Sequence, residues 1–285
     1  MSRITRRMFV AQSAALVPAA RMAFGREPLT SQNLGVQLYT VRNIINQDPA
    51  KILHEIQDIG YKELECTSGN LNQIWPALKQ TSLRPVSVHL AGLESGDKYT
   101  STLNDLKQKG FEYVVVPYLD LVKGGMDGLK RTADALNAMG EKAVAQGMTF
   151  CYHNHAHDFS AMGGSNALEL MLKATNPQYV QLELDVFWVS VAGLDPVKVL
   201  QQYAGRVPLV HLKDKAKSFT KTQFNENVPH DAFASVGSGS VDFPAILSIA
   251  AASGVRNYFV EQDQTPGSPI DALRSSYEYL KTQFK

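Results

Sequence analysis

The chain has 285 residues, of which 44% are hydrophobic and 19% are charged, as in an ordinary globular protein. Its formal net charge of +1 gives no electrostatic reason to expect a nucleic-acid partner, because proteins that bind nucleic acid usually carry a basic patch or stripe. No apolar run reaches the ~18 residues of a membrane-spanning helix, so we expect no membrane span in the mature chain.

The N-terminus has the layout of an export signal. Basic residues come first, a largely apolar stretch follows over residues 9–20, and small residues come next. Residues 5–9, Thr-Arg-Arg-Met-Phe, resemble the twin-arginine export motif, whose route carries folded proteins. An ordinary amphipathic N-terminal helix is the alternative. We predict a signal segment over residues 1–28 and export by the twin-arginine route to the periplasm.

From residue 34 onward, short apolar runs alternate with segments of helical spacing. The predicted strands cover residues 34–39, 63–66, 85–90, 113–117, 149–153, 180–184, 207–212 and 258–261. The predicted helices cover residues 49–59, 71–80, 99–109, 128–146, 167–174, 196–203, 244–253 and 269–282. Such alternation predicts βαβ units and a parallel sheet, and eight units in ~250 residues fit a closed barrel.

We therefore predict a single α/β domain over residues 29–285, a (β/α)8 TIM barrel. An open doubly wound sheet is the alternative fold. It is weakened by the absence of a Gly-x-Gly-x-x-Gly turn after the first predicted strand.

The chain has two cysteines, Cys66 and Cys151. An exported protein could join them in a disulfide. Side chains alternate in direction along a strand, which places Cys66 on the face opposite Glu65 and Cys151 on the same face as His153. We therefore expect two buried free thiols rather than a disulfide.

Polar side chains end most of the predicted strands. In TIM barrels the active site lies at the C-terminal ends of the strands. Asp185, His211 and Glu261 end three neighbouring strands and would converge if they point into the barrel mouth. Carboxylate and imidazole ligands suit one divalent ion such as Mn²⁺, Mg²⁺, Co²⁺ or Zn²⁺. A buried, hydrogen-bonded network without metal is the alternative.

The fifth predicted strand ends in His153, Asn154 and His155, and His157 follows. Residues two apart on a strand lie ~6.6 Å apart, so we expect one or two of these histidines near the metal and the others near the substrate. A local three-histidine metal site is the alternative.

Three further strand-end residues are candidates for the site. Glu65 and His89 end the second and third strands, and Lys213 follows His211. We expect Glu65 and His89 to bind substrate together with Asn154, and Lys213 to stabilise an oxyanion or anchor a substrate oxygen. The alternatives are a Glu65 paired with a nearby cation, a core histidine at position 89 and a solvent-facing lysine.

Taken in chain order, these strand ends resemble the xylose isomerase-like, or sugar phosphate isomerase/epimerase, superfamily of barrels. The matching segments are residues 35–42 (GVQLYTVR), 152–155 (YHNH), 182–185 (LELD), 211–214 (HLKD), 236–239 (VGSG) with 242–243 (DF), and 258–263 (YFVEQD). Each is weak alone, but their order on consecutive strands is specific. The similarity runs from residue 34 to the C-terminus.

The resemblance implies a metal held by Glu, Asp, His and Glu from strands five to eight. Asp185, His211 and Glu261 match the last three positions. His153 stands where many relatives have the first glutamate, and it is the predicted fourth ligand. Epimerases of this group are thought to shuttle the proton between two ligand glutamates, a role that a metal-bound neutral histidine cannot easily take. Trp188 replaces a histidine of some relatives, and we expect it to stack on a sugar ring or to pack.

The resemblance also implies enediolate chemistry on a sugar or keto-sugar, as in a metal-dependent isomerase or epimerase. Glu261 would be both ligand and general base, with Lys213 and His155 as further catalytic residues. Elimination from the same intermediate would instead give a lyase or dehydratase, for example on a 3-keto-glycoside or an inosose-like substrate. The loss of the first glutamate favours this alternative, and export disfavours sugar phosphates as substrates.

Two non-isomerase alternatives belong to other classes. A non-catalytic sugar-binding barrel would bind metal or sugar without turnover. An endonuclease IV-like nuclease would need more metal ligands and a basic DNA track, which this near-neutral chain lacks. We expect a small-molecule sugar as the partner, and the sequence allows a homo-oligomer.

Overall fold

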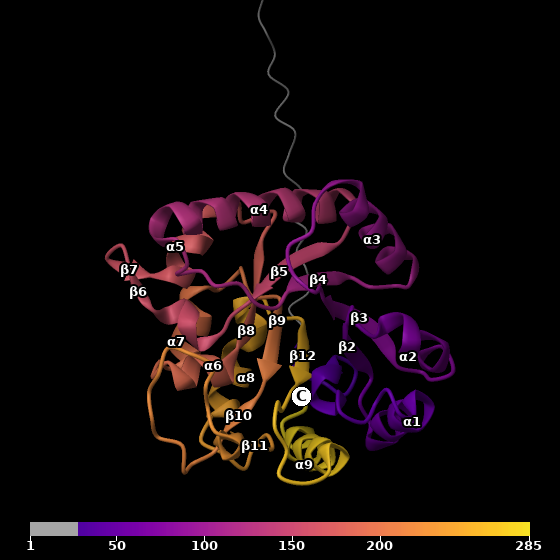
Figure 1. The fold of residues 1–285 in the computed structure, drawn as a ribbon. Helices are drawn as coiled ribbons and strands as arrows, with labels where there is room; N and C mark the ends of the chain where they lie inside the picture. The colour runs from indigo at the N-terminus through magenta and orange to yellow at the C-terminus, as the bar shows by residue number, and fades with distance from the viewer. Residues whose placement is uncertain (1–27) are drawn as a thin grey trace, which may run out of the picture.

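A computed structural model describes residues 28–285 as a closed eight-stranded parallel barrel surrounded by helices (Figure 1). The barrel strands are β1 (Leu34–Gln37), β2 (Glu63–Thr67), β3 (Arg84–His89), β4 (Tyr113–Val116), β5 (Thr149–His153), β8 (Gln181–Asp185), β9 (Leu209–Leu212) and β12 (Asn257–Val260). They follow one another around the barrel in chain order, and β12 pairs with β1 to close it. The structure confirms the predicted TIM barrel. The predicted signal segment lies outside the described residues, apart from Pro28.

The helices pack on the outside of the barrel (Figure 1). They are α1 (Pro49–Ile59), α2 (Leu71–Leu78), α3 (Gly96–Gln108), α4 (Gly125–Ala145), α5 (Ala167–Ala174), α6 (Val186–Val191), α7 (Pro196–Gln202), α8 (Phe243–Ser253) and α9 (Pro269–Lys281). Helix α6 is the one that the sequence did not predict. Among residues 28–285, no helix combines the length and apolarity that crossing a bilayer requires.

Local sequence explains where helices begin and end. Asp48 caps α1 by accepting the Lys51 N–H at 3.0 Å, and Pro49 takes the first helical position, where its missing N–H is not needed. The helix ends at Gly60, whose φ of +125° is difficult for any other residue. Asp48 and Gly60 therefore set the bounds of α1.

The barrel wall separates two apolar regions. A large core lies between strands and helices and contains Cys66, and a small core inside the barrel contains Cys151 and Phe259. Phe259 fills the interior opposite Gly35, where a Cβ atom would lie 2.6 Å from the phenyl ring. The two cysteines are buried and free, which confirms the expectation that they face different sides of the wall.

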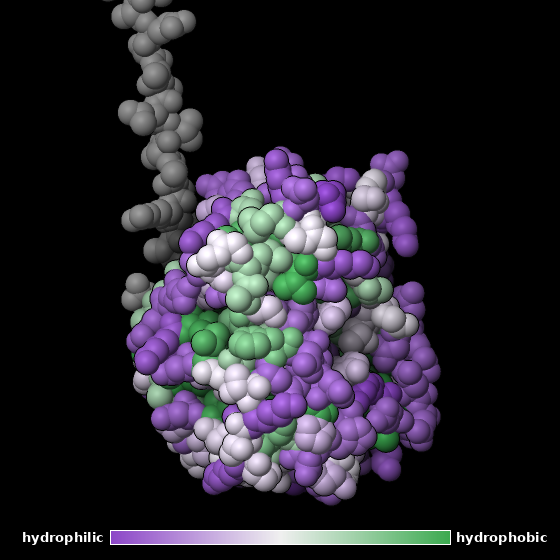
Figure 2. Space-filling view, turned by 60° about the vertical axis from the view of Figure 1, so that its left-hand side comes forward, coloured by the Kyte–Doolittle hydropathy of each residue, from purple (hydrophilic) through white to green (hydrophobic). Residues whose placement is uncertain are grey.

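Smaller elements lie at the C-terminal end of the barrel. They are the hairpins β6 (Ala161–Met162) with β7 (Ser165–Asn166) and β10 (Asp214–Lys215) with β11 (Phe233–Ala234), and the 3-10 helices η1 (Leu38–Val41), η2 (Ala156–Phe159) and η3 (His230–Ala232). The flank of the molecule in Figure 2 is largely hydrophilic, and polar side chains interrupt its apolar areas. The homo-oligomer that the sequence allows stays a prediction.

The glycines of residues 236–239 have a structural role at this end. The Asp214 carboxylate accepts the backbone N–H groups of Gly237 and Gly239 at 2.9 and 2.8 Å. Gly237 has a φ of +91°, and a Cβ there would lie within 2.2 Å of the Tyr279 ring. The loop therefore fixes Asp214, and with it the neighbouring Lys213, at the end of β9.

Candidate metal centre and pocket

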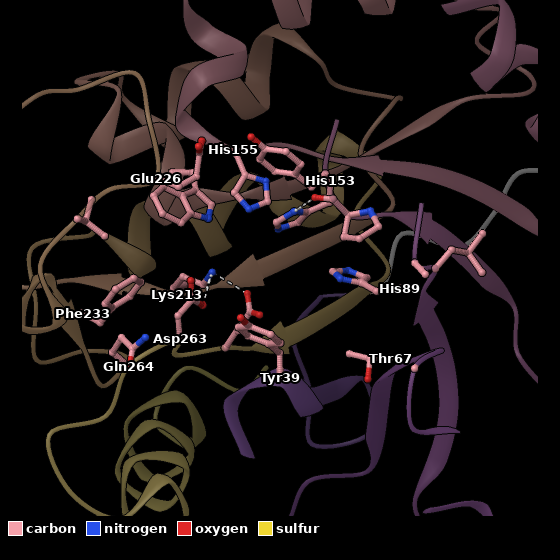
Figure 3. A pocket seen from close by; sticks show the side chains of 18 of the residues that line it. Tyr39, Thr67, His89, His153, His155, Lys213, Glu226, Phe233, Asp263 and Gln264 are labelled. Carbon is pink, nitrogen blue, oxygen red and sulfur yellow. Dashed lines mark hydrogen bonds and ion pairs between the residues drawn. The ribbon is translucent and has the colours of Figure 1, made fainter. Parts of the chain in front are cut away.

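A cavity of about 670 Å³ opens at the C-terminal ends of the strands (Figure 3). This is the end at which TIM-barrel enzymes place their active sites, and the volume is in the usual range for small-molecule sites. Its charged, imidazole and aromatic lining residues are Tyr39, His89, Tyr118, His153, His155, Trp188, Lys213, Glu226, His230, Phe233, Glu261 and Asp263.

Asp185 is held in place by the helix that follows it. The residue ends β8 and is also the N-cap of α6, so its Oδ1 accepts the N–H groups of Phe187 at 2.8 Å and Trp188 at 3.2 Å. Oδ2 accepts no hydrogen bond and makes an ion pair with Lys213. The cap thus uses one carboxylate oxygen and leaves the other directed into the site.

His153 ends β5 and faces Asp185. Its Nδ1 lies 3.1 Å from the carbonyl oxygen of Pro117, which can only accept, so Nδ1 carries a hydrogen and Nε2 is the nitrogen that faces Asp185. Nε2 has no hydrogen-bond partner among residues 28–285 and lies 3.4 Å from Asp185 Oδ2. Two buried polar atoms without a hydrogen-bond partner among the described residues therefore face each other.

His211 and Glu261 complete the group from β9 and the end of β12. His211 Nδ1 lies 3.0 Å from Glu261 Oε2 and 3.9 Å from Asp185 Oδ2. One atom each of His153, Asp185, His211 and Glu261 lies within 4.8 Å of the others. The structure thus brings the four predicted ligands together.

Lys213 extends into the same group from β9. Its Nζ lies 3.0 Å from Asp185 Oδ2, 2.7 Å from Glu261 Oε2 and 2.7 Å from Asp263 Oδ1. Figure 3 shows Lys213 beside Asp263. It also lies 5.4 Å from the centre of the Trp188 ring. The side chain is 2% exposed, so the alternative of a solvent-facing lysine is excluded.

The charges of this group perturb one another. Burial alone would raise the pKa of the Asp185 carboxyl, but the Lys213 ammonium and His153 hold it well below its usual range. The pKa of Glu261 is lowered in the same way, against burial, by Lys213 and His211. Burial alone would lower the pKa of Lys213, and Asp185, Asp263 and Glu261 raise it well above its usual value. The carboxylates of Asp185 and Glu261 and the ammonium are therefore all charged at neutral pH.

The residues fit a divalent ion. Two ligands of one tetrahedral ion, each at ~2.1 Å, lie ~3.4 Å apart, which is the separation of His153 Nε2 and Asp185 Oδ2. Three carboxylates, those of the buried Asp185 and Glu261 and of the half-buried Asp263, face one lysine, and uncompensated buried charge is costly. An additional cation would balance them, but metal binding itself stays a prediction.

The other predicted site residues divide into two sets. His89, His155 and Trp188 line the cavity. Asn154 and Glu65 are fully buried and do not line it. Asn154 donates to the Asp185 carbonyl at 3.3 Å and accepts the Asp185 N–H at 3.0 Å, so its amide joins the ends of β5 and β8.

Several lining residues were not predicted. Asp263 follows Glu261 by two residues and shares its direction, a spacing that could have identified it. Glu226 comes from the segment between β10 and β11, which has no periodic pattern. His157 holds Glu226 at the cavity through an Nδ1 contact of 2.6 Å to Oε1.

Comparison with known families adds a classification. The family model for the xylose isomerase-like TIM barrel matches residues 89–283. The chain belongs to this family. The resemblance that the strand ends suggested is thereby confirmed.

Inosose dehydratases are among the curated relatives that match. The protein from Clostridium botulinum is 29% identical over 159 residues, which cover 52% of each chain. Inosose dehydratase 1 from Bacillus cereus is 30% identical over 156 residues, 52% of this chain and 50% of its own. The match thus spans about half the length of these relatives.

Solved structures share the fold over nearly the whole barrel. A sugar phosphate isomerase/epimerase from Parabacteroides distasonis superposes with a TM-score of 0.74, 23% identity and coverage of 87% and 97% of the two chains. The IolI protein with a bound zinc atom superposes with a TM-score of 0.65 and 15% identity, over 89% of this chain and 99% of its own. The 3-keto-D-glucoside 4-epimerase of E. coli superposes with a TM-score of 0.64 and 16% identity, over 88% of this chain and 99% of its own.

Proposed function

We propose that this protein is a divalent-metal-dependent enzyme that removes a proton beside the carbonyl group of a keto-sugar and then eliminates a β-oxygen substituent, as a lyase or dehydratase does. The division of the pocket carries this proposal. Glu261 and Asp263 follow β12, whereas the imidazoles of His89 and His155 come from β3 and from the residues after β5, and these two strands flank the strand opposite β12. A carboxylate base on one wall can take the proton, and imidazoles on the other wall can hydrogen-bond the departing oxygen, which is the arrangement that elimination requires.

Each wall has its own part in the reaction. When bound by His153, Asp185, His211 and Glu261, a divalent ion would supply Lewis-acid polarisation of the carbonyl group. Glu261 takes the proton from carbon, and the freed electron pair forms the enediolate of the substrate. The Lys213 ammonium faces the oxygen on which negative charge grows.

The β-carbon–oxygen bond then breaks as the enediolate collapses. The departing oxygen leaves toward the imidazole wall, where His155 hydrogen-bonds it and water supplies its proton. Burial, together with His153 and Lys213, lowers the pKa of His155, so the ring is a neutral donor in this role.

Pocket lining and charge support an unphosphorylated sugar-like substrate. Four aromatic residues, Tyr39, Tyr118, Trp188 and Phe233, line the cavity and offer ring faces for stacking. Among the described lining residues there is one lysine and no arginine, and the lysine already pairs with three carboxylates. A phosphate group would find no bidentate partner of the kind that arginine provides. A 3-keto-glycoside or an inosose fits these features.

An isomerase or epimerase is the second candidate. It shares the first proton abstraction and returns a proton to carbon instead of losing a β-substituent. The shared fold with a 3-keto-D-glucoside 4-epimerase supports it, as the match to inosose dehydratases supports elimination. The substitution of histidine for glutamate at position 153 favours elimination, because the second carboxylate base is missing.

The test is turnover in D2O. Protein loaded with Mn²⁺, Co²⁺ or Zn²⁺ is incubated with a methyl 3-keto-glucoside and with an inosose, and the products are followed by NMR. We expect release of methanol or water with an unsaturated ketone, and loss of this activity in Glu261→Gln. Glu278→Gln, on the exposed face of α9, is the matched control and should keep full activity.

The outcomes separate the candidates. Deuterium incorporation with a changed configuration and no released alcohol or water would replace the lyase by the epimerase. Sugar binding without exchange or elimination for any of the metals would overturn both enzymes and favour a non-catalytic sugar-binding barrel.

We also propose that the protein works in the periplasm, as residues 1–28 predict. An unphosphorylated sugar substrate suits this location, since sugar phosphates are mainly cytoplasmic. In cell fractionation we expect the wild type in the periplasm, and the double variant Arg6→Lys with Arg7→Lys in the cytoplasm. Equal distribution of both forms would contradict export by this route.

A further inference from the structure

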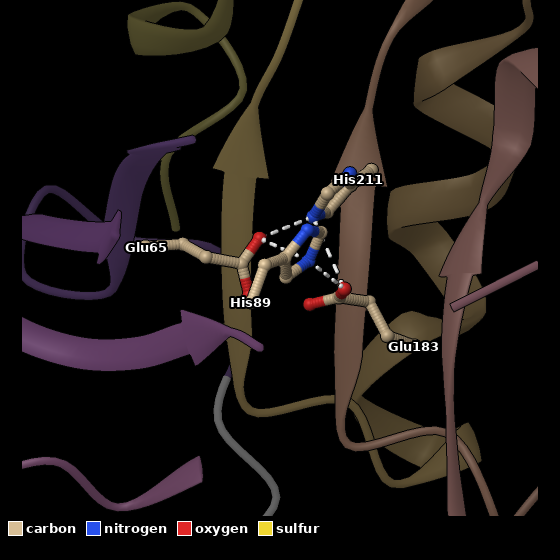
Figure 4. A group of neighbouring side chains, drawn as sticks. All are labelled: Glu65, His89, Glu183 and His211. Atoms are coloured by element: carbon tan, nitrogen blue, oxygen red, sulfur yellow. Dashed lines mark hydrogen bonds and ion pairs between the residues drawn. The ribbon is translucent and has the colours of Figure 1, made fainter. Parts of the chain in front are cut away.

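A second polar group lies directly beneath the predicted metal ligands. Glu65 from β2, His89 from β3 and Glu183 from β8 surround the lower edge of His211 (Figure 4). His211 Nε2 lies 2.5 Å from Glu65 Oε2 and 3.4 Å from Glu183 Oε2. His89 Nε2 lies 2.7 Å from Glu183 Oε2 and 3.2 Å from Glu65 Oε2. His211 therefore belongs to two groups. The upper group consists of the predicted metal ligands His153, Asp185, His211 and Glu261, and the lower group consists of Glu65, His89, Glu183 and His211.

The spacing of the lower group differs from that of a metal site. Two ligands of one ion, at ~2.0–2.1 Å each, lie at least ~2.9 Å apart when they subtend a right angle. The His211–Glu65 and His89–Glu183 contacts, at 2.5 and 2.7 Å, are shorter than this and have the length of charge-assisted hydrogen bonds. In the structure both contacts are hydrogen bonds between a ring nitrogen and a carboxylate oxygen.

Glu65 is itself held rigidly. Gln37 Nε2 donates to Oε2 at 2.8 Å, and Ser87 Oγ donates to Oε1 at 2.6 Å. The side chain is fully buried, so no water competes for it. Both carboxylate oxygens are fixed, and Oε2 also faces His211 Nε2.

This contact determines which nitrogen of His211 can bind a cation. A carboxylate accepts a hydrogen bond, so Nε2 carries the hydrogen. Nδ1 is then the nitrogen that faces the upper group, where it hydrogen-bonds Glu261 Oε2 at 3.0 Å, and a cation bound there would take the place of its hydrogen. A carboxylate bonded to the far nitrogen of a ligand histidine fixes its ring orientation and raises its basicity.

We propose that Glu65, fixed by Gln37 and Ser87, is a positioning residue that holds His211 in the orientation and tautomer required for metal binding, and that the lower group holds no second ion. The proposal rests on metal binding by the upper group, which belongs to the proposed function. It gives Glu65 a role other than the substrate contact that the sequence suggested.

The test measures metal affinity and stoichiometry rather than turnover. Metal-free wild type and Glu65→Gln are titrated with Co²⁺, and the visible absorption of the bound ion and the metal content are recorded. We expect one ion per chain in both, an affinity about 10–100-fold lower in Glu65→Gln, and a changed Co²⁺ spectrum. Glu63→Gln is the matched control: Glu63 lies on the same strand, is buried and bonds Arg84 and Asn257 instead of His211.

Folding is checked by circular dichroism and thermal melting. If Glu65→Gln does not fold, Ser87→Ala serves instead, because it keeps the carboxylate and frees one of its oxygens. For this variant we expect a smaller loss of affinity, with the same direction of spectral change.

Unchanged Co²⁺ affinity and spectrum in the folded variants, with a wild type that binds the ion, would overturn the positioning role alone. Two ions per wild-type chain, one of them lost in Glu65→Gln, would show a second metal site and overturn it as well. A wild type that binds no ion would overturn the proposed metal dependence together with this inference.

Discussion

The Nε2 atom of His153 lies 3.4 Å from the Oδ2 atom of Asp185, and neither atom takes part in a hydrogen bond among residues 28–285. Because the Nδ1 hydrogen of His153 bonds the Pro117 carbonyl group, Nε2 is the nitrogen that faces Asp185. This pair distinguishes the upper group of the site from the hydrogen-bonded layer below it. It also leads to the first of four predictions.

Replacement of His153 tests the strand-five position. His153→Ala removes one ligand and should weaken Co²⁺ binding by at least about 10-fold, since even residues outside the coordination shell have effects of that size. His153→Glu supplies a carboxylate oxygen there and should restore most of the affinity. Calorimetric titration of the two variants checks this. If His153→Ala binds as tightly as wild type, His153 is not a ligand.

Asp185 has two roles that substitution can separate. Asparagine keeps the N-cap of α6 but loses the charge, whereas alanine loses both. We expect both variants to lose metal binding, and Asp185→Ala to be less stable than Asp185→Asn by about 1 kcal/mol. Urea denaturation of the metal-free proteins measures the difference. Equal stabilities would mean that the cap contacts contribute nothing.

Lys213 compensates the buried carboxylates when no metal is bound. Lys213→Met should destabilise the metal-free protein by about 3–5 kcal/mol, because it leaves buried charges unpaired. A bound divalent ion would take over this compensation, so the rise in Tm on adding metal should be larger in Lys213→Met than in wild type. Lys173→Met removes an exposed ion pair on α5 and should behave like wild type. An equal metal-induced rise in both would contradict the prediction.

The contact between His157 and Glu226 makes stability depend on pH. Burial alone would lower the pKa of His157, but bonds to Asp158 and Glu226 raise it from 6.5 to about 11. A raised folded-state pKa gives stability that is complete below pH 6.5 and is lost as the pH rises toward 11. The stability advantage of wild type over His157→Gln should therefore shrink by at least about 1 kcal/mol between about pH 6 and about pH 9.5.

Denaturation curves at several pH values measure this advantage. His54→Gln, an exposed histidine on α1, provides the control and should show no such trend. An advantage of wild type over His157→Gln that is constant with pH would mean that His157 is not charged in the folded protein.

Most of the fold follows from periodicity, and the exception has a physical cause. Apart from Ser190, residues 186–191 are β-branched or aromatic, so they look like a continuation of the strand before them. In the structure they form α6, because Asp185 caps the first turn and ends β8. The local preference for strand is overridden by a capping contact that the sequence pattern does not reveal.

The site was partly predictable for a similar reason. Asp185, His211 and Glu261 end apolar strands, where polar residues are conspicuous. Glu183 lies two residues before Asp185 and shares its direction, so strict alternation could have identified it. Glu226 could not be found in this way, since its position depends on a contact with His157 across the chain.

The separation of Cys66 and Cys151 by the barrel wall bears on where the protein can mature. Neither thiol can reach the other, so the barrel is held together without a covalent cross-link between them. Folding of the barrel therefore requires no disulfide between them, in a reducing or in an oxidising compartment. A chain of this kind can reach its final form in the cytoplasm and keep it unchanged on the far side of the membrane.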